Sequence, residues 1–449
     1  MLILLLENIV NKVIVDFSKK CGKVKPMHAV NNGPLALNER GTSNFEEYKA
    51  LGIPYARNHD ASYHAGYGGE HTVDVHRIFK NFDADENDPK SYIFEPTDKY
   101  IKTTLDAGTK IFYRLGAAIE HGYKFGTIPP KDNHKWARIC EHIIRHYNEG
   151  WANGFEYGIE YWEIWNEPEH DSNWQGTMDD FIEFYTVVSR HLKSSFPHLK
   201  IGGPAFTCPW IDYEPRERFM KAVKERNLPM DFFSYHRYSK TPQGIAEAAE
   251  DGKKILDELG IENAETILDE WNYIYGWRGD EWKYSMEMER GLKGSSVIAG
   301  TMALCQYTSI DMLMYYDARP CEMCGIFDPI APWKLLKGYY PFMMFSELYA
   351  LGESVKAVGD ENMIPVAATD GKNATVMLTY FDDDDNAPKK EVNIELSSLT
   401  EGAKSVECYL LDGEKNMELV KTELINEACT NLRFEMTLFS TYLIKIKSK

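Results

Sequence analysis

The chain has 449 residues, a formal net charge of −19 and a hydrophobic fraction of 43%. This length exceeds one ordinary domain and matches an α/β barrel of roughly 250 residues that is enlarged by loops and joined to a small second domain. The negative charge argues against nucleic acid or an anionic membrane as a partner, because both would be repelled.

Eight cysteines are scattered along the chain, too sparsely for a disulfide framework, so we expect reduced thiols. Cys321 and Cys324 form a single C-x-x-C motif, for which a metal or redox role is the alternative to free loop thiols. The first ten residues lack the basic region and the cleavage site of a signal peptide, and their apolar run is too short to span a bilayer. We therefore expect a cytoplasmic protein.

Short apolar runs alternate with segments of helical period along the first three quarters of the chain. This alternation predicts parallel strands joined by crossover helices, and eight strand candidates indicate a (β/α)8 TIM barrel. The expected strands are residues 24–30, 54–57, 110–115, 161–167, 200–203, 231–238, 267–270 and 311–316, and the expected helices are residues 44–51, 97–107, 133–148, 178–196, 216–226, 245–259 and 286–304.

Both ends of the chain carry β-type patterns outside the barrel. Residues 9–17 form a β-rich run. Towards the other end, strand-like runs separated by turns lie at residues 365–368, 375–381, 391–396, 405–411 and 437–446, with an acidic tip at residues 382–385. We therefore expect an N-terminal strand within residues 1–22, a catalytic barrel over residues 23–350, and a small antiparallel β-sandwich domain over residues 351–449 that the first strand joins.

The stretch Y-W-E-I-W-N-E-P at residues 161–168 predicts a buried strand that stops at a polar pair, because Pro168 has no amide hydrogen for a sheet. Asn166 and Glu167 are thus expected at the carboxyl end of a strand, the catalytic face of an α/β barrel. Glu270 follows another short apolar run in the same way. Two such carboxyl groups, about 5 Å apart, are what a retaining glycosidase needs, with Glu167 as acid/base and Glu270 as nucleophile.

Further polar side chains are expected around these two glutamates. Asn166 is expected to donate to a sugar hydroxyl, and Tyr238 or His236 to orient the nucleophile by hydrogen bonding. Arg57 is expected to keep the nucleophile ionised by charge pairing. His59 is a candidate substrate ligand, with a loop cap as the alternative. The expected substrate-binding residues are therefore Arg57, His59, Asn166, His236 and Tyr238.

Neighbouring acids offer alternatives to this assignment. Glu163 is expected deeper in the barrel, paired with a buried arginine. Asp269 is the rival of Glu270, and we expect only one of the two to face the site, because adjacent strand residues point to opposite sides. Any single glutamate at a strand end can instead form a structural ion pair.

The long excursion after the second strand, residues 62–96, is expected to be a functional loop or an inserted subdomain, because loops of this length in a compact domain are usually one or the other. Its histidines, His64, His71 and His76, match no metal-site spacing and are expected on the surface or in a substrate loop. Glu120 and His121 are expected near the same barrel face.

The ordered motifs resemble glycoside hydrolase family 39 of clan A, a family that includes β-xylosidases and α-L-iduronidases. The resemblance implies Glu167 as acid/base, Glu270 as nucleophile, and a β domain built from both chain ends. It rests on R-N-H at residues 57–59, E-I-W-N-E-P at 163–168, I-G-G-P at 201–204, D-F-F-S-Y-H at 231–236 and L-D-E-W-N at 268–272.

Two features depart from the family pattern. Asp269 stands where the family usually has a small residue or threonine, and a nearby negative charge would raise the pKa of Glu270. Residues 62–96 and 319–328 do not match the xylosidases. Because such loops build sugar subsites, the resemblance does not identify the substrate.

We therefore expect a retaining, exo-acting, β-xylosidase-like hydrolase of small oligosaccharides that needs no metal or organic cofactor. Its expected partner is an oligosaccharide or glycoside substrate, and neither nucleic acid nor a membrane is expected. Assembly into a homo-oligomer is compatible with the sequence. A non-catalytic carbohydrate-binding barrel is one alternative. An α-L-iduronidase-like enzyme on uronic-acid glycans is another, for which His121, Arg237 or Arg319 can supply the basic residue.

Overall fold

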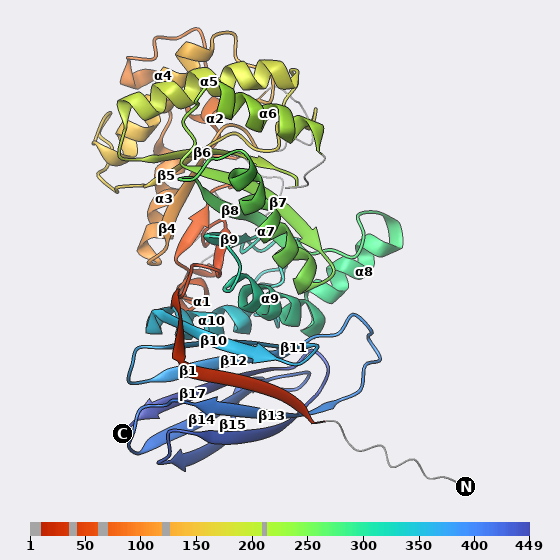
Figure 1. The fold of residues 1–449 in the computed structure, drawn as a ribbon. Coiled ribbons are helices and arrows are strands. Elements are labelled where there is room, and N and C mark those ends of the chain that lie inside the picture. Colours follow the sequence, from red (N-terminus) through yellow and green to blue (C-terminus); the bar gives the residue numbers. More distant parts are fainter. Residues whose placement is uncertain (1–9, 36–42, 62–70, 119–125, 209–212) are drawn as a thin grey trace.

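A closed barrel and a nine-stranded sheet make up the molecule, with two helices between them (Figure 1). The computed structural model describes residues 10–35, 43–61, 71–118, 126–208 and 213–449. None of the helices in these ranges is both long and apolar enough to cross a membrane.

The barrel contains eight parallel strands that close in chain order from β2 to β9. All eight coincide with strands expected from the sequence, so the predicted (β/α)8 barrel is confirmed. Helices cover the outside, which explains why these strands are apolar on both faces. Their bounds are β2 (Ala29–Asn31), β3 (Tyr55–Arg57), β4 (Lys110–Leu115), β5 (Tyr161–Ile164), β6 (Lys200–Phe206), β7 (Phe232–Ser239), β8 (Glu265–Tyr273) and β9 (Met312–Tyr315).

The helices around the barrel begin and end near their sequence signals. Thr177 caps α5 in a reciprocal capping box with Asp180, as its position in the sequence indicates. The expected helix over residues 286–304 is instead two helices that meet at Gly291. The helices are α1 (Phe45–Ala50), α2 (Val75–Ile78), the 3-10 helix η1 (Pro89–Ser91), α3 (Glu95–Asp106), α4 (Asn133–Asn148), α5 (Met178–Ser195), α6 (Glu214–Glu225), α7 (Pro242–Glu258), α8 (Gly279–Glu289), α9 (Leu292–Cys305) and α10 (Tyr339–Leu351).

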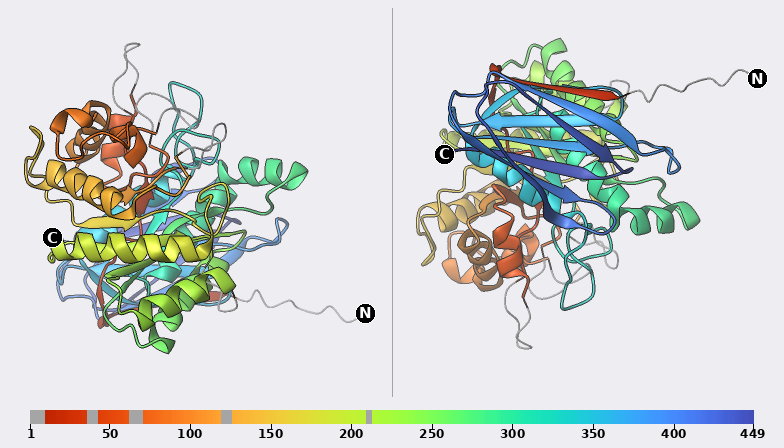
Figure 2. Two further views of the ribbon diagram at one scale, coloured as in Figure 1. Left: turned by 90° about the horizontal axis from the view of Figure 1, so that it is seen from above. Right: turned by 90° about the horizontal axis from the view of Figure 1, so that it is seen from below.

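The second sheet is built from both ends of the chain. Its strand order is β15-β14-β17-β12-β11-β10-β1-β13-β16, and Figure 2 shows the red first strand among blue C-terminal strands. One pairing is parallel, because β1 runs alongside β13, while the others are antiparallel. Its strands are β1 (Asn11–Lys23), β10 (Glu353–Gly359), β11 (Met363–Thr369), β12 (Ala374–Tyr380), β13 (Lys390–Ser397), β14 (Lys404–Leu411), β15 (Asn416–Ile425), β16 (Thr430–Met436) and β17 (Thr441–Ser448).

Helices α9 and α10 pack between the barrel and this sheet (Figure 1). Ile364, Val366 and Met377 of β11 and β12 belong to the same apolar cluster as the barrel core. A second cluster, which includes Val13 and Ile394, fills the other side of the sheet. The sheet is thereby fixed to the flank of the barrel, away from the carboxyl ends of the barrel strands.

Candidate active site

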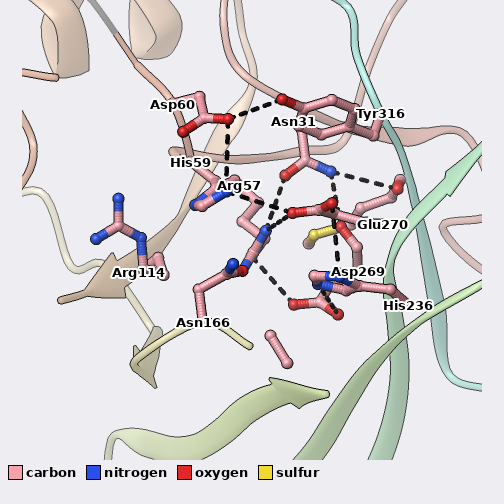
Figure 3. A network of polar contacts seen from close by, with 12 residues as sticks. Asn31, Arg57, His59, Asp60, Arg114, Asn166, His236, Asp269, Glu270 and Tyr316 are labelled. Atoms are coloured by element: carbon pink, nitrogen blue, oxygen red, sulfur yellow. Dashed lines mark hydrogen bonds and ion pairs between the residues drawn. The ribbon is translucent and has the colours of Figure 1, made fainter. Parts of the chain in front are cut away.

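The carboxyl ends of four barrel strands bring the expected site residues together. Figure 3 shows Arg57, Asn166, His236 and Glu270 among them. Arg57 ends β3, and Glu167 follows β5 by three residues. His236 and Tyr238 lie on β7, and Glu270 lies on β8. Side chains far apart in the sequence therefore converge at one mouth of the barrel.

Arg57 is the cation at the centre of this group and is fully buried. Its Nη1 donates to Glu270 Oε1 at 2.8 Å, and its Nη2 donates to Asn166 Oδ1 at 2.6 Å. Its Nε donates to Glu163 Oε2 at 2.7 Å, so the expected pairing of Glu163 with a buried arginine is confirmed. Burial lowers the pKa of Arg57, but the charges of Glu163, Asp269 and Glu270 more than offset this and raise it.

Glu167 lies in a hydrogen-bonded but partly accessible position, with 19% of its side chain exposed. Its Oε1 is 2.7 Å from His236 Nδ1, and its Oε2 accepts from Asn173 Nδ2 at 2.9 Å. Burial raises the pKa of Glu167 to about 7 and lowers that of His236 to about 4. At neutral pH, Glu167 is thus readily protonated beside an uncharged imidazole.

Glu270 is held by two donors on its two oxygens. Arg57 donates to Oε1, and the Tyr238 hydroxyl donates to Oε2 at 2.9 Å. Burial raises the pKa of Glu270, and this effect outweighs the lowering by His236 and Arg57, so the pKa is raised overall. An oxygen of Glu270 and an oxygen of Glu167 lie within 4.8 Å of one another. This spacing is close to the roughly 5 Å between the carboxyl groups of a retaining glycosidase.

The same three groups, Glu167, His236 and Glu270, are close enough to share a metal ion. However, His236 Nδ1 lies against Glu167, and both oxygens of Glu270 already accept hydrogen bonds from protein donors. Across the described ranges, no other set of three potential ligands is as close. The arrangement fits a pair of carboxyl groups with opposed environments better than a ligand set.

Asp269 and Glu270 both face inward, so the expectation that only one of them does is wrong. The pairing of β8 with β7 shifts by one residue, because Leu268 pairs with Tyr235 and Glu270 pairs with His236. Asp269 is the extra residue of this irregularity, and its Oδ2 lies 3.1 Å from Arg57 Nε. Burial, followed by the charge of Glu163, raises the pKa of Asp269 well above its usual value. Burial thus favours the protonated form of Asp269.

His59 and Asp60 lie on the opposite side of Glu270 from His236 and are buried. His59 Nε2 is 3.5 Å from Glu270 Oε1, and the Tyr316 hydroxyl donates to Asp60 Oδ2 at 2.7 Å. Within the described residues, His59 Nδ1 and Asp60 Oδ1 have no hydrogen-bond partner. Buried polar atoms of this kind are available to bind hydroxyl groups.

The sequence analysis did not single out Tyr316 or Asn173 as site residues. Tyr316 follows the eighth barrel strand directly, so its position at a strand end is the signal that points to it. Asn173 lies in the loop after β5, and no local pattern marks it.

Other sequence expectations lie outside this constellation. His64, Glu120 and His121 fall outside the described residues. Arg237 donates through Nε to the Gly244 carbonyl, so its side chain is directed to the α7 side. Cys321 and Cys324 are both buried as thiols, and burial raises the pKa of each. Buried protonated thiols are poor metal ligands and poor nucleophiles.

Two relatives match part of the chain and carry the name beta-xylosidase. The protein from Geobacillus stearothermophilus is 29% identical over 217 residues, which is 44% of this chain and 40% of that protein. The one from Caldicellulosiruptor saccharolyticus is 26% identical over 277 residues, 55% of this chain and 53% of that protein. The chain thus spans about half the length of the relatives it matches.

A solved structure is similar over almost the whole chain. It is a glucosidase from Croceicoccus marinus, with a TM-score of 0.80 and 20% identity, covering 98% of this chain and 99% of that chain. At this identity, the likeness establishes the fold alone. The model of Glycosyl hydrolases family 39 matches residues 11–268, more than half of the chain and ending two residues before Glu270. The chain belongs to glycosyl hydrolase family 39.

Proposed function

We propose that the chain hydrolyses glycosidic bonds with retention of anomeric configuration, using Glu167 as acid/base and Glu270 as nucleophile. One observation carries the proposal: two carboxyl groups within 4.8 Å have opposed surroundings. Glu167, with a pKa of about 7, is poised to hold a proton, whereas Glu270 is hydrogen-bonded by Arg57 and Tyr238 in its ionised form.

In the first step, Glu270 attacks the anomeric carbon while Glu167 donates its proton to the glycosidic oxygen. A bond forms between Glu270 and the sugar, and the leaving alcohol departs with the proton. The hydrogen bond between Glu167 and His236 keeps the acid oriented. Because the imidazole is uncharged above about pH 4, it does not compete as a cation with the developing charge on the sugar.

In the second step, the ionised Glu167 removes a proton from water, which attacks the anomeric carbon and releases Glu270. The ester bond cancels the negative charge of Glu270 during the interval between the two steps. Since that charge raises the pKa of a neighbouring carboxyl group, its loss makes Glu167 a stronger acid and therefore stable as the ionised base.

For the sugar bound to Glu270, we propose a neutral pentose or hexose, with β-xylosidase-like, exo-acting hydrolysis as the leading activity. The two named relatives support the xylose assignment. Asp60 supports a neutral sugar. Its Oδ1 has no hydrogen-bond partner among the described residues and lies 3.9 Å from His71 Nδ1, and a carboxylate in this position accepts hydroxyl protons but repels a uronate. This repulsion disfavours the α-L-iduronidase-like alternative.

We further propose that the protein works in the cytoplasm on soluble oligosaccharides or glycosides. All eight cysteines are unpaired, and Cys21 and Cys429 are exposed. Exposed free thiols persist best in a reducing compartment, which supports this assignment.

A panel of nitrophenyl glycosides in both anomeric forms tests the proposal. It contains xylosides, arabinosides, galactosides, glucosides, iduronides and glucuronides. We expect turnover of the β-xyloside by the wild-type protein and a loss of at least about 10³-fold in Glu270→Ala, since covalent catalysis then has no nucleophile. Glycan binding without any hydrolysis, on the panel or on natural oligosaccharides, would instead establish a non-catalytic carbohydrate-binding barrel.

A further inference from the structure

An exposed tryptophan, Trp277, and a partly buried one, Trp282, form an aromatic pair beside the candidate site. Trp277 lies in the loop between β8 and α8 and is 56% exposed. Its ring stacks on Trp282 of α8, with centroids 5.8 Å apart and an interplanar angle of 21°. Exposing a large apolar side chain to water is energetically unfavourable, so an exposed indole beside a candidate site indicates a ligand-binding surface.

The pair is continuous with the catalytic residues. Trp277 meets the ring of Tyr238 edge to face, with centroids 5.0 Å apart and an interplanar angle of 80°. The hydroxyl of the same Tyr238 donates to Glu270. A ligand lying on Trp277 is therefore one side chain away from the nucleophile.

The position of the two tryptophans in the barrel mouth indicates which part of the substrate contacts them, the sugar that Glu270 attacks or the leaving group. In the closed barrel, β7 lies opposite β3, so Tyr238 and Trp277 face His59 and Asp60 across the mouth. His59 Nδ1 and Asp60 Oδ1 have no hydrogen-bond partner among the described residues, so they suit the hydroxyls of the sugar that Glu270 attacks. Glu167 is hydrogen-bonded to His236 of β7, the strand that also carries Tyr238. Because Glu167 protonates the leaving group, the leaving group lies on the same side of the mouth as the two tryptophans.

The β domain holds this segment in place. Asp385 of the acidic tip accepts from Tyr284 of α8 at 2.6 Å and from Lys293 of α9 at 2.6 Å. Asp383 accepts from Lys240, which follows β7, also at 2.6 Å. In Figure 1, α8 projects from the barrel, and these contacts tie it to the loop between β12 and β13. The aromatic surface is thus ordered before any ligand arrives, which lowers the entropic cost of binding.

We propose that Trp277 and Trp282 form a stacking platform for the sugar on the leaving-group side of the scissile bond. The C–H face of a neutral pyranose packs on the electron-rich face of an indole. The substrate is accordingly an oligosaccharide of at least two sugar rings. This inference rests on the proposed hydrolase function and adds a binding subsite to it.

The test compares a substrate that has a leaving sugar with one that has none. Xylobiose and β-D-xylosyl fluoride form such a pair, or their counterparts for whichever sugar the glycoside panel identifies. In Trp277→Ala, kcat/KM for the disaccharide is expected to fall by about tenfold or more, while kcat/KM for the fluoride changes by less than about twofold. Trp277→Phe keeps an aromatic face and is expected to recover part of the loss.

Equal losses on both substrates, or no loss on either, would overturn the platform while leaving the hydrolase proposal intact. Leu424→Ala is the control, because Leu424 is 64% exposed on β15 of the β domain, and its removal is expected to alter neither rate. If Trp277→Ala converts a dimer to a monomer in sedimentation velocity, the pair is a contact between two copies of the chain and the platform is rejected.

If the wild-type protein hydrolyses nothing, the platform is tested separately by binding. Xylobiose is then titrated into the wild type and into Trp277→Ala by isothermal titration calorimetry, which does not depend on the fluorescence of Trp277. Saturable binding in the wild type that is weakened in the variant supports the platform without hydrolysis, and unchanged or absent binding refutes it.

Discussion

At the scale of single residues, the site is defined by one buried cation among three carboxyl groups. Arg57 contacts Glu163, Asp269 and Glu270, and all four side chains are buried. One positive charge cannot balance three ionised carboxylates in a medium of low polarity, so at least one proton must be held. Because burial raises the pKa of Asp269 well above its usual value, we infer that Asp269 is the group that takes up this proton, which leaves Arg57 to stabilise Glu270 as an anion.

Substitution of Arg57 should therefore lower the stability of the fold much more than substitution of Asp269. Arg57→Met leaves buried carboxylates unpaired and is expected to lower the free energy of unfolding by about 3–5 kcal/mol. Asp269→Asn replaces a protonated carboxyl group by an amide of equal charge, and a change of less than about 1 kcal/mol is expected. Urea denaturation at pH 7 measures both, and an Asp269→Asn variant as unstable as Arg57→Met would contradict the protonation assignment.

The pH dependence of kcat/KM follows from the two glutamates. Glu167 acts as an acid in its protonated form, so activity is expected to fall as the pH rises through about 7. Glu270 acts in its ionised form, so activity is lost again as the pH falls through its raised pKa. A pH profile with a glycoside of poor leaving group measures both limbs. In Glu167→Gln the alkaline limb should disappear, and a wild-type rate that stays constant from pH 6 to about 9 would count against Glu167 as the acid.

At the scale of secondary-structure elements, the barrel was more predictable than the β domain. Each barrel strand is a short apolar run with a polar end, and all eight were predicted from that pattern. The sequence analysis did not identify β10, β15 or β16. Strands β15 and β16 are the two edges of the sheet, and β15 has no fully buried residue, so no buried stripe marks it in the sequence.

The irregular strand pairing at Asp269 could not be predicted from the residues around it in the sequence. Adjacent residues of a regular strand point to opposite sides, and the inward position of both acids arises only from the shifted pairing of β8 with β7. Five residues proposed on sequence grounds nevertheless lie near the two glutamates, because strand-end polar residues meet at one mouth of a barrel; they are Arg57, His59, Asn166, His236 and Tyr238. Asn173 lies in a loop, and no comparable rule predicts where a loop residue lies relative to the site.

Close packing of β6 against β7 gives a prediction for one glycine. A Cβ atom on Gly202 would lie 2.2 Å from the Phe232 carbonyl oxygen, so the two strands must move apart to accept it. Gly202→Ala is expected to lower the free energy of unfolding by about 1–3 kcal/mol and to reduce activity, since β7 carries His236 and Tyr238. Thermal denaturation tests this against Gly413→Ala, where nothing lies within 4 Å of the added atom. Equal stability of the two variants would refute the argument.

At the scale of the whole molecule, the barrel and the β domain share their interior. Ile364 and Met377 of the sheet lie in the apolar cluster that includes Ile298 of α9 and Phe345 of α10. The ion pair between Lys293 and Asp385 adds a polar link near the mouth, with only 5% of the Lys293 side chain exposed. Neither part can separate without exposing apolar surface, which costs roughly 25 cal/mol per Å².

This shared core predicts cooperative unfolding. Differential scanning calorimetry is expected to show one transition for the full chain, because loss of the sheet uncovers α9 and α10. Two well-resolved transitions would show that the barrel is stable without the sheet and would contradict the structural role assigned to the interface.

The central claim is that Glu270 becomes covalently bonded to the sugar, and active-site labelling tests it most directly. A 2-deoxy-2-fluoro glycosyl fluoride of the sugar that the panel identifies slows the second step, so the glycosyl-enzyme accumulates. After proteolysis and mass spectrometry, we expect a single labelled peptide with the modification on Glu270, and no label in Glu270→Ala. A label on Asp269, or an inverted product formed without any labelled enzyme, would contradict the account.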